Sequence, residues 1–169
     1  MKTDSEQPKI SVIVSTYNAE AWLEKVLWGF NCQTYRDFEV VIADDGSGPA
    51  TRQLLERMHS EVFYPIEHVW QEDDGFQKSR ILNKSVEACK SDYIIMTDGD
   101  CIPREDFVQV HYINKEKGYF ISGGYYMLPM NISLMITRED IEKQRCFDIQ
   151  WLKDKGIPKT FKNNKLTAS

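Results

Sequence analysis

Residues 10–18 read ISVIVSTYN, and the run from Ile10 to Ser15 is almost entirely apolar and rich in β-branched side chains. A continuous apolar run of this length is typical of a strand that is buried on both faces, as in a parallel sheet. The next residues, from about Ala19 to Cys32, have apolar side chains at three- and four-residue spacing, which predicts a helix. We expect Asn18 to cap this helix.

The same alternation of strand and helix patterns continues along the chain. We expect further strands at 38–43, 66–70, 92–97 and 119–122, and helices at 50–59, 77–89, 104–117 and 138–145. Strands that alternate with helices of this kind imply right-handed crossovers and a parallel sheet. We therefore predict an α/β fold with a mostly parallel sheet flanked by helices. It would form a single domain over residues 9–155, after a disordered segment at 1–8 and before a loop or frayed tail at 156–169.

The composition excludes several classes of protein. The 169 residues are 41% hydrophobic and 28% charged, as in a globular protein and not a disordered one. The net charge of −5 argues against a nucleic-acid partner, because such proteins bind phosphates with basic patches. The N-terminal MKTDSEQPK lacks the apolar stretch of a secretory signal, and no run approaches the ~20 apolar residues that cross a bilayer. We expect no transmembrane segment and a cytoplasmic location, free or peripheral at the membrane's cytoplasmic face.

The four cysteines are expected to be reduced core or surface residues. They are Cys32, Cys89, Cys101 and Cys146. No two of them form a Cys-x-x-Cys pair, and none lies at a spacing usual for a zinc site.

Polar clusters follow three of the predicted strands. They are Ser15-Thr16-Tyr17-Asn18, Asp44-Asp45-Gly46-Ser47 and Asp98-Gly99-Asp100. In an open parallel sheet, ligands bind beyond the carboxyl ends of the strands, near the point where the strand order reverses. Three clusters at three strand ends therefore predict one binding crevice.

Asp98-Gly99-Asp100 is the most informative cluster. Two carboxylates separated by glycine can present oxygens to one hard cation, and Mg²⁺ or Mn²⁺ prefers such ligands, often shared with substrate phosphates. The glycine also allows the backbone to approach a ligand closely. Asp-x-Asp is common at ordinary turns, but its position directly after a strand favours metal binding.

The other polar residues have structural alternatives. Asp44 and Asp45 begin turn chemistry that leads into a helix, so one acid could cap while the other faces a ligand. Tyr17 offers a flat face for stacking, or belongs to the core. Arg80 is either a surface cation or meets a diphosphate held by the metal.

Several motifs together resemble those of inverting family 2 glycosyltransferases with a GT-A fold. The three signature stretches are ISVIVSTYN at 10–18, ADDGS at 43–47 and DYIIMTDGD at 92–100. Arg80-Ile81-Leu82-Asn83 resembles the Arg-x-x-Asn element of the family, and 70–76 is similar to chondroitin-polymerase-like and polysaccharide-biosynthesis members. The resemblance covers about residues 9–111, and the order and spacing of the motifs make it specific.

The resemblance implies a nucleotide-sugar site and a role for each residue in it. Thr16 and Tyr17 would line the base pocket beside Asn18, and Asp45, with Asp44, would read uracil or another base. Asp98 would touch ribose or metal next to Gly99, Asp100 would be the metal ligand, and Arg80 and Asn83 would hold the donor and its loop. The implied cofactor is Mn²⁺ or Mg²⁺.

The implied chemistry is inverting transfer of a sugar from a nucleoside diphosphate sugar, UDP-linked, to a glycan or lipid-linked acceptor in polysaccharide or glycoconjugate biosynthesis. Such transfer needs a general base, which in the family is often a Glu-Asp pair after Trp-Gly in the acceptor-binding half. Glu139-Asp140 lacks that context and is better explained as a helix start capped by Thr137. We expect the chain to end before the acceptor half, with the base beyond residue 169.

Two alternatives remain open. A sugar nucleotidyltransferase shares a similar sheet and metal use, but it would carry a glycine-rich, Arg-containing loop after the first strand, where this chain has Ser15-Thr16-Tyr17-Asn18. A nucleotide-sugar-binding module without catalysis is the second. Acceptor-dependent turnover would distinguish an enzyme from such a module.

Overall fold

Residues 8–157 are described by the computed structural model, and they divide after Ile113 into two units. The expected disordered segment at 1–8 and tail at 156–169 lie outside the described residues, apart from Pro8, Gly156 and Ile157. None of the helices within 8–157 is long and apolar enough to cross a membrane.

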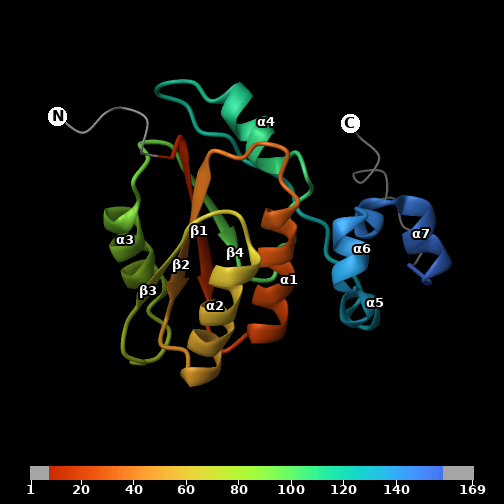
Figure 1. Ribbon diagram of the computed structural model, residues 1–169, viewed down its shortest axis with the longest axis horizontal. Helices are drawn as coiled ribbons and strands as arrows, with labels where there is room; N and C mark the ends of the chain where they lie inside the picture. Colours follow the sequence, from red (N-terminus) through yellow and green to blue (C-terminus); the bar gives the residue numbers. More distant parts are fainter. Residues whose placement is uncertain (1–7, 158–169) are drawn as a thin grey trace. The chain divides into compact units, whose positions relative to one another are not determined.

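A four-stranded parallel sheet forms the centre of the first unit (Figure 1). Its strands are β1 (Ile10–Thr16), β2 (Phe38–Asp44), β3 (Ile66–Trp70) and β4 (Ile94–Asp98), in the spatial order β3-β2-β1-β4. The predicted α/β fold is therefore confirmed. Ser15 on β1 lies level with Ala43 on β2 and with Asp98 on β4, so the three polar clusters start at one edge of the sheet.

Helices cover both faces of this sheet. Figure 1 shows α1 (Glu20–Asn31) and α2 (Pro49–Glu61) on one side and α3 (Lys78–Ala88) on the other. Ile13, Val41 and Ala43 pack with Ile81 of α3, which explains why β1 and β2 read as unbroken apolar runs. The chain steps outward from β1 to β3 and then returns to β4, so the strand order reverses between β1 and β4. This is where an open sheet binds ligands.

Asn18 does not cap α1 as predicted. The N-cap of α1 is Ala19, and Asn18 has a left-handed backbone with φ of 45°. The Asn18 Oδ1 atom instead accepts a hydrogen bond from the N–H of Gly48, the N-cap of α2, at 2.9 Å. In return the Asn18 N–H donates to the Ser47 hydroxyl at 2.8 Å. The side chain therefore ties the loop after β1 to the loop after β2.

A buried carboxylate joins the strands at the opposite edge of the sheet. Glu39 is 1% exposed and accepts hydrogen bonds from the Ser11 hydroxyl and the Lys90 N–H, each at 2.7 Å. The Lys90 ammonium lies 3.2 Å from its other oxygen. Ser11 in turn accepts from the Ser91 N–H at 3.0 Å. This network connects β1 and β2 to the segment that enters β4.

The helix after β4 is shorter than predicted. It is α4 (Phe107–Asn114), whereas the sequence pattern indicated 104–117. Pro103 therefore lies four residues before the helix and not next to its first turn.

The second unit is built from short helices over 114–157. They are α5 (Met130–Met135), α6 (Arg138–Glu142), the 3-10 helix η1 (Arg145–Phe147) and α7 (Ile149–Asp154). The strand predicted at 119–122 is wrong: these residues form no strand, and Tyr119 and Phe120 are 74% and 90% exposed. The helix predicted at 138–145 is interrupted by Gln144, which has φ of 53°. Thr137 and Asp140 form the predicted capping box.

Candidate functional site

A pocket of about 350 Å³ opens at the carboxyl ends of the strands. Thr16 and Tyr17 line it from the end of β1, Asp45 from β2 and Asp98 from β4. The loop after β3 and the first turns of α3 complete the wall, chiefly through Asp73, Gly75, Phe76, Lys78 and Ile81. Each of the three strand-end clusters therefore contributes a side chain to one pocket, although Asn18, Asp44, Gly99 and Asp100 do not line it.

Asp98 is held by two neighbours that the sequence reasoning did not identify. The Ser15 hydroxyl donates to its Oδ1 atom at 2.8 Å, and the Lys78 ammonium lies 2.5 Å from the same oxygen. Hydrogen bonding from Lys78, with a smaller contribution from Ser15, lowers the pKa of Asp98 below its usual 3.8. Asp98 is therefore ionised at neutral pH, with a lysine beside it inside the pocket.

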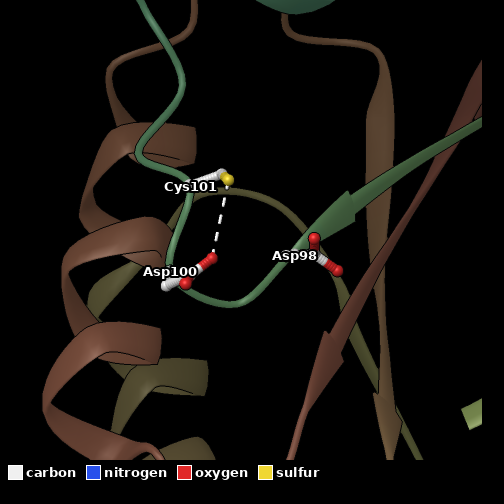
Figure 2. Close-up of side chains that lie close together, drawn as sticks. All are labelled: Asp98, Asp100 and Cys101. Carbon is white, nitrogen blue, oxygen red and sulfur yellow. Dashed lines mark hydrogen bonds between the residues drawn. The ribbon is translucent and has the colours of Figure 1, made fainter. Parts of the chain in front are cut away.

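Asp100 lies on the turn after β4, close to Asp98 and Cys101 (Figure 2). One ligand atom from each of these three side chains lies within 4.8 Å of the others, so the group can hold a single cation. Asp98 and Asp100 are exposed, and carboxylate oxygens are the ligands that Mg²⁺ and Mn²⁺ prefer. The donor set of this turn thus fits a hard divalent cation. The neighbouring thiol was missed by spacing rules, which look for pairs of cysteines.

Cys101 is expected to be unreactive at neutral pH. Burial, and then the adjacent Asp100 charge, raises its pKa to about 11. Because the thiolate is the nucleophile, alkylation by iodoacetamide at pH 8 should be roughly a hundredfold slower than for a cysteine in an unfolded peptide of pKa ≈ 8.5. Mass spectrometry of the labelled protein between pH 7 and 10 measures this. Labelling of Cys101 at the peptide's rate would contradict the assignment.

Asp45 holds both ends of the loop that follows β3. Its Oδ1 atom accepts from the Gln71 side-chain amide at 2.6 Å, and its Oδ2 atom accepts from the Gln77 N–H at 2.8 Å. The Tyr17 hydroxyl donates to Asp73 in the middle of the same loop at 2.9 Å. Asp45 is only 7% exposed, yet it lines the pocket. It therefore connects the pocket wall to the loop 71–77.

Gly46 permits the close approach of this loop. It has φ of 101°, and a Cβ atom there would lie 2.6 Å from the Asp73 Cα. Gly99 has a similar function at the next strand end, because a Cβ atom there would lie 2.7 Å from the Ser15 carbonyl oxygen. Beside Gly99, the Thr16 hydroxyl is buried and has no hydrogen-bond partner within the described chain. The turn after β4 thus packs directly on the end of β1.

Asp44 serves the turn and does not line the pocket. It is fully buried; its Oδ1 accepts from the Ser47 N–H at 2.8 Å, and its Oδ2 lies 2.9 Å from His68 Nε2. Burial alone would raise the pKa of Asp44, but the hydrogen bonds from His68 and Ser47 outweigh it and lower the pKa below 3.8. Of the two adjacent acids, Asp45 is the one at the pocket.

The Asp44 carboxylate should stabilise the fold in a pH-dependent way. Because its folded pKa is lowered, its contribution is complete above the unfolded pKa of about 3.9 and is lost as pH falls through the folded value. Urea unfolding of the protein and of Asp44→Asn should show a clear difference in unfolding free energy at pH 5. The difference should shrink below pH 4. A difference that stays constant to pH 3 would refute this.

Arg80 and Asn83 lie away from the strand-end pocket. Arg80 lines a second pocket of about 540 Å³ on α3 and the loop 71–77, with Trp70, Glu72 and Lys84 among its other residues. Asn83 is exposed on α3 and lines neither pocket. Lys78, two residues before Arg80 on α3, lines the strand-end pocket instead. Only its position on the folded helix distinguishes it from Arg80.

Comparison with known proteins gives consistent matches. The sequence profile described as Glycosyl transferase family 2 matches residues 11–161. The chain is 32% identical over 120 residues to Glycosyltransferase GlyA of Streptococcus pneumoniae serotype 4, a match that covers 70% of this chain and 17% of that protein. It is 26% identical over 164 residues to Chondroitin synthase of Escherichia coli, covering 94% of this chain and 22% of that protein. The chain thus spans about a fifth of these relatives.

Solved structures share the fold of about two thirds of this chain. One is S. aureus TarS 1-349 in complex with UDP-GlcNAc, with a TM-score of 0.52 and 25% identity over 62% of this chain and 30% of that chain. Another is the mannosyltransferase PcManGT from Pyrobaculum calidifontis in complex with GDP-Man and Mn²⁺. It has a TM-score of 0.53 and 26% identity, and covers 66% of this chain and 34% of that chain.

Proposed function

Since the chain belongs to glycosyl transferase family 2, we propose that its strand-end pocket binds the nucleoside diphosphate sugar from which the whole protein transfers a sugar, with inversion, to a glycan or lipid-linked acceptor. The observation that carries this proposal is the convergence of Tyr17, Asp45 and Asp98 from three neighbouring strands on one pocket. The TarS and mannosyltransferase structures, which contain UDP-GlcNAc and GDP-Man, support a donor of this class.

In this proposal the nucleobase of the donor lies between Tyr17 and Asp45. Tyr17 is half exposed and offers a ring face for stacking, while its hydroxyl is fixed by Asp73. Each carboxylate oxygen of Asp45 has one hydrogen bond, so each keeps one lone pair, and either can accept the imide N–H of uracil. Thr16 supplies a buried hydroxyl without a partner within the described residues, next to Gly99. These contacts favour a uridine donor.

The diphosphate lies toward Asp98 and Asp100 in this proposal, with Mn²⁺ or Mg²⁺ as the cofactor. When bound, the cation supplies charge stabilisation for the departing diphosphate. Without a cation, the two carboxylates would repel the phosphates. Lys78 pairs with Asp98 and lines the pocket, so it would be placed to contact a phosphate oxygen if Asp98 and Asp100 held the cation. Asn18 acts indirectly, because its hydrogen bonds join the loop after β1 to the loop after β2.

The general base of the reaction is proposed to lie outside the described residues. The Asp140 carboxylate accepts from the Thr137 N–H in the capping box of α6. It also forms an ion pair with Arg145 at 3.3 Å. Glu139 is paired with Lys143 at 2.6 Å. Both carboxylates therefore have structural partners. On this basis the chain alone binds donor but transfers sugar slowly, because loss of a general base removes on the order of 10²–10⁴ in rate.

Calorimetric titration with UDP, GDP and CDP in the presence of Mn²⁺ tests the base pocket. We expect the chain to bind UDP most tightly, and Asp45→Ala to weaken UDP binding about tenfold or more through the lost imide contact and the released loop. Asp74→Ala is the matched control, since Asp74 is an exposed acid of the same loop that lines only the second pocket. Equal UDP affinity in Asp45→Ala and the unmodified protein would remove Asp45 from the base site.

A further inference from the structure

The two acids of the Asp98-Gly99-Asp100 turn are held very differently. The Asp98 carboxylate is fixed by Ser15 and Lys78. Among residues 8–157, the hydrogen-bond partner of the Asp100 carboxylate is the Cys101 thiol alone, at 3.5 Å. A thiol is a weak donor, so this bond restrains the side chain weakly. The position of Asp100 therefore depends on how its backbone is held.

The backbone before Asp100 is attached to β1. The Gly99 N–H donates to the Ser15 carbonyl at 2.8 Å, and the Cys101 N–H closes the turn onto the Asp98 carbonyl at 3.1 Å. The backbone after Asp100 continues through Pro103, whose ring restricts its φ angle, into the polar residues 104–106 that precede α4. Movement of this following segment would therefore be passed back to Asp100 over only three residues.

Gln33, just after α1, holds this following segment. It is 2% exposed, and its side chain makes three hydrogen bonds. The amide nitrogen donates to the Arg104 carbonyl at 2.7 Å and to the Gly29 carbonyl at 3.1 Å. The amide oxygen accepts from the Val108 N–H at 2.9 Å. One buried carboxamide thus joins the end of α1 to both ends of the segment 104–108.

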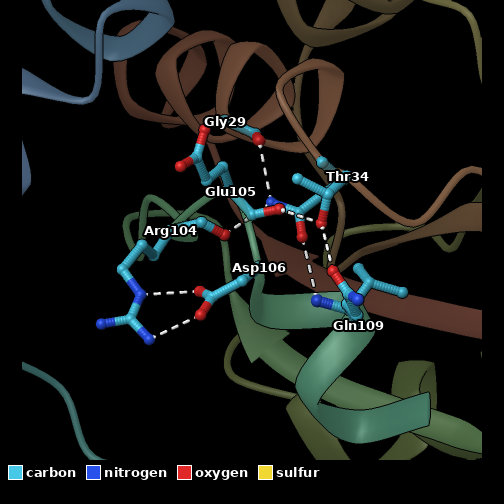
Figure 3. Close-up of polar contacts among 8 residues, drawn as sticks. Gly29, Thr34, Arg104, Glu105, Asp106 and Gln109 are labelled. Carbon is cyan, nitrogen blue, oxygen red and sulfur yellow. Dashed lines mark hydrogen bonds and ion pairs between the residues drawn. The ribbon is translucent and has the colours of Figure 1, made fainter. Parts of the chain in front are cut away.

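Two neighbours strengthen this attachment (Figure 3). The Thr34 N–H donates to the Glu105 carbonyl at 2.8 Å, and its hydroxyl donates to the Gln109 side chain at 2.7 Å. Gly29 leaves no space behind the segment, because a Cβ atom there would lie 2.6 Å from Pro103 Cδ. Gly29, Gln33 and Thr34 together form what we call the α1 clamp.

We propose that Gln33 is a positioning residue which, through the α1 clamp, fixes Asp100 in the geometry that a divalent cation requires. The inference rests on the proposed metal role of Asp98 and Asp100. The residues of the α1 clamp do not line the pocket, so in this proposal they hold the cation site from outside it. Mg²⁺ and Mn²⁺ demand defined ligand geometry, so a small displacement of one carboxylate lowers affinity.

Mn²⁺ alone is the probe for this proposal, with the free ion measured by electron paramagnetic resonance in the absence of nucleotide. Gln33→Met keeps the side-chain volume and removes all three hydrogen bonds. Gly29→Ala is locally favourable in a helix but pushes on Pro103. Each should raise the Mn²⁺ dissociation constant at least fivefold. Two different perturbations of one clamp keep the test valid if either variant folds poorly.

Ser11→Ala is the matched control. It also removes buried hydrogen bonds, at the opposite edge of the sheet, and should change the Mn²⁺ dissociation constant less than twofold. Wild-type affinity in Gln33→Met and Gly29→Ala overturns the role of the clamp while leaving the proposed function intact. Equal weakening in Ser11→Ala would assign the effect to general loss of stability and also overturn it. A wild-type protein that binds no Mn²⁺, either alone or with UDP present, refutes the metal role itself.

Discussion

Asp100→Asn should lower the Mn²⁺-dependent affinity for UDP by about tenfold or more, because loss of even a hydrogen-bond partner of a metal ligand costs about 10–100-fold in metal affinity. The substitution keeps the size of the side chain and removes the charge that a cation needs. Because Asp100 has a single weak hydrogen bond within the described chain, its loss should leave the fold unchanged. The measurement is calorimetric titration of UDP at fixed Mn²⁺, with urea unfolding of the same sample.

Asp106→Asn provides the control for this prediction. Asp106 is a nearby acid, paired with Arg104 at 2.6 Å, and it lines neither pocket. Its substitution should change UDP affinity less than about twofold, because the backbone of its segment is still held by Gln33 and Thr34. UDP binding by Asp100→Asn at the wild-type level, with Mn²⁺ present, would remove Asp100 from the metal site.

Glu39→Leu should lower the free energy of unfolding by roughly 3 kcal/mol. The reason is that Ser11 and the Lys90 N–H would both lose a buried acceptor, and the Lys90 ammonium would lose its partner. Nucleotide binding by the folded fraction should not change, since this network lies at the edge of the sheet opposite the pocket. Chemical unfolding monitored by circular dichroism measures the stability.

Lys90→Met separates the contributions in this network. Lys90 is half exposed, so removing its ammonium alone should cost less than about 1 kcal/mol, while the backbone N–H still donates to Glu39. If Glu39→Leu and Lys90→Met were equally destabilising, the ion pair and not the buried hydrogen bonds would account for the stability.

The sheet could be predicted from the sequence because both of its faces are covered. Burial on two sides forces the unbroken apolar runs of β1 and β2, and their boundaries were predicted to within one residue. The aromatic run at 119–122 has the composition of a strand but lies against no neighbouring strand. Sequence composition reports burial tendency, whereas a strand also needs a partner. The prediction that Asn18 caps α1 failed for a related reason, because its side chain accepts a hydrogen bond from a loop 30 residues away in the sequence.

The same distinction applies to the site. The place of Asp98 at the pocket could be predicted because this acid ends a buried-strand pattern in the local sequence, whereas the metal role of Asp98 and Asp100 stays a prediction. The contact of Lys78 with Asp98 could not be predicted, since it joins α3 to β4. Whether Lys78 or Arg80 lines the strand-end pocket depends on how α3 is rotated about its axis. The proposed role of Gln33 is harder still to predict from the sequence, because Gln33 contacts only the backbone of residues 104–108 and not the turn itself.

A crystal structure of the chain with UDP and Mn²⁺ tests the central claim most directly, with the metal located by anomalous scattering. The account predicts an anomalous peak beside Asp98 and Asp100, within about 2.5 Å of a carboxylate oxygen. It also predicts the uracil ring between Tyr17 and Asp45. Nucleotide bound instead in the second pocket, near Trp70 and Arg80, would contradict the account, as would density for UDP without a metal peak at the turn.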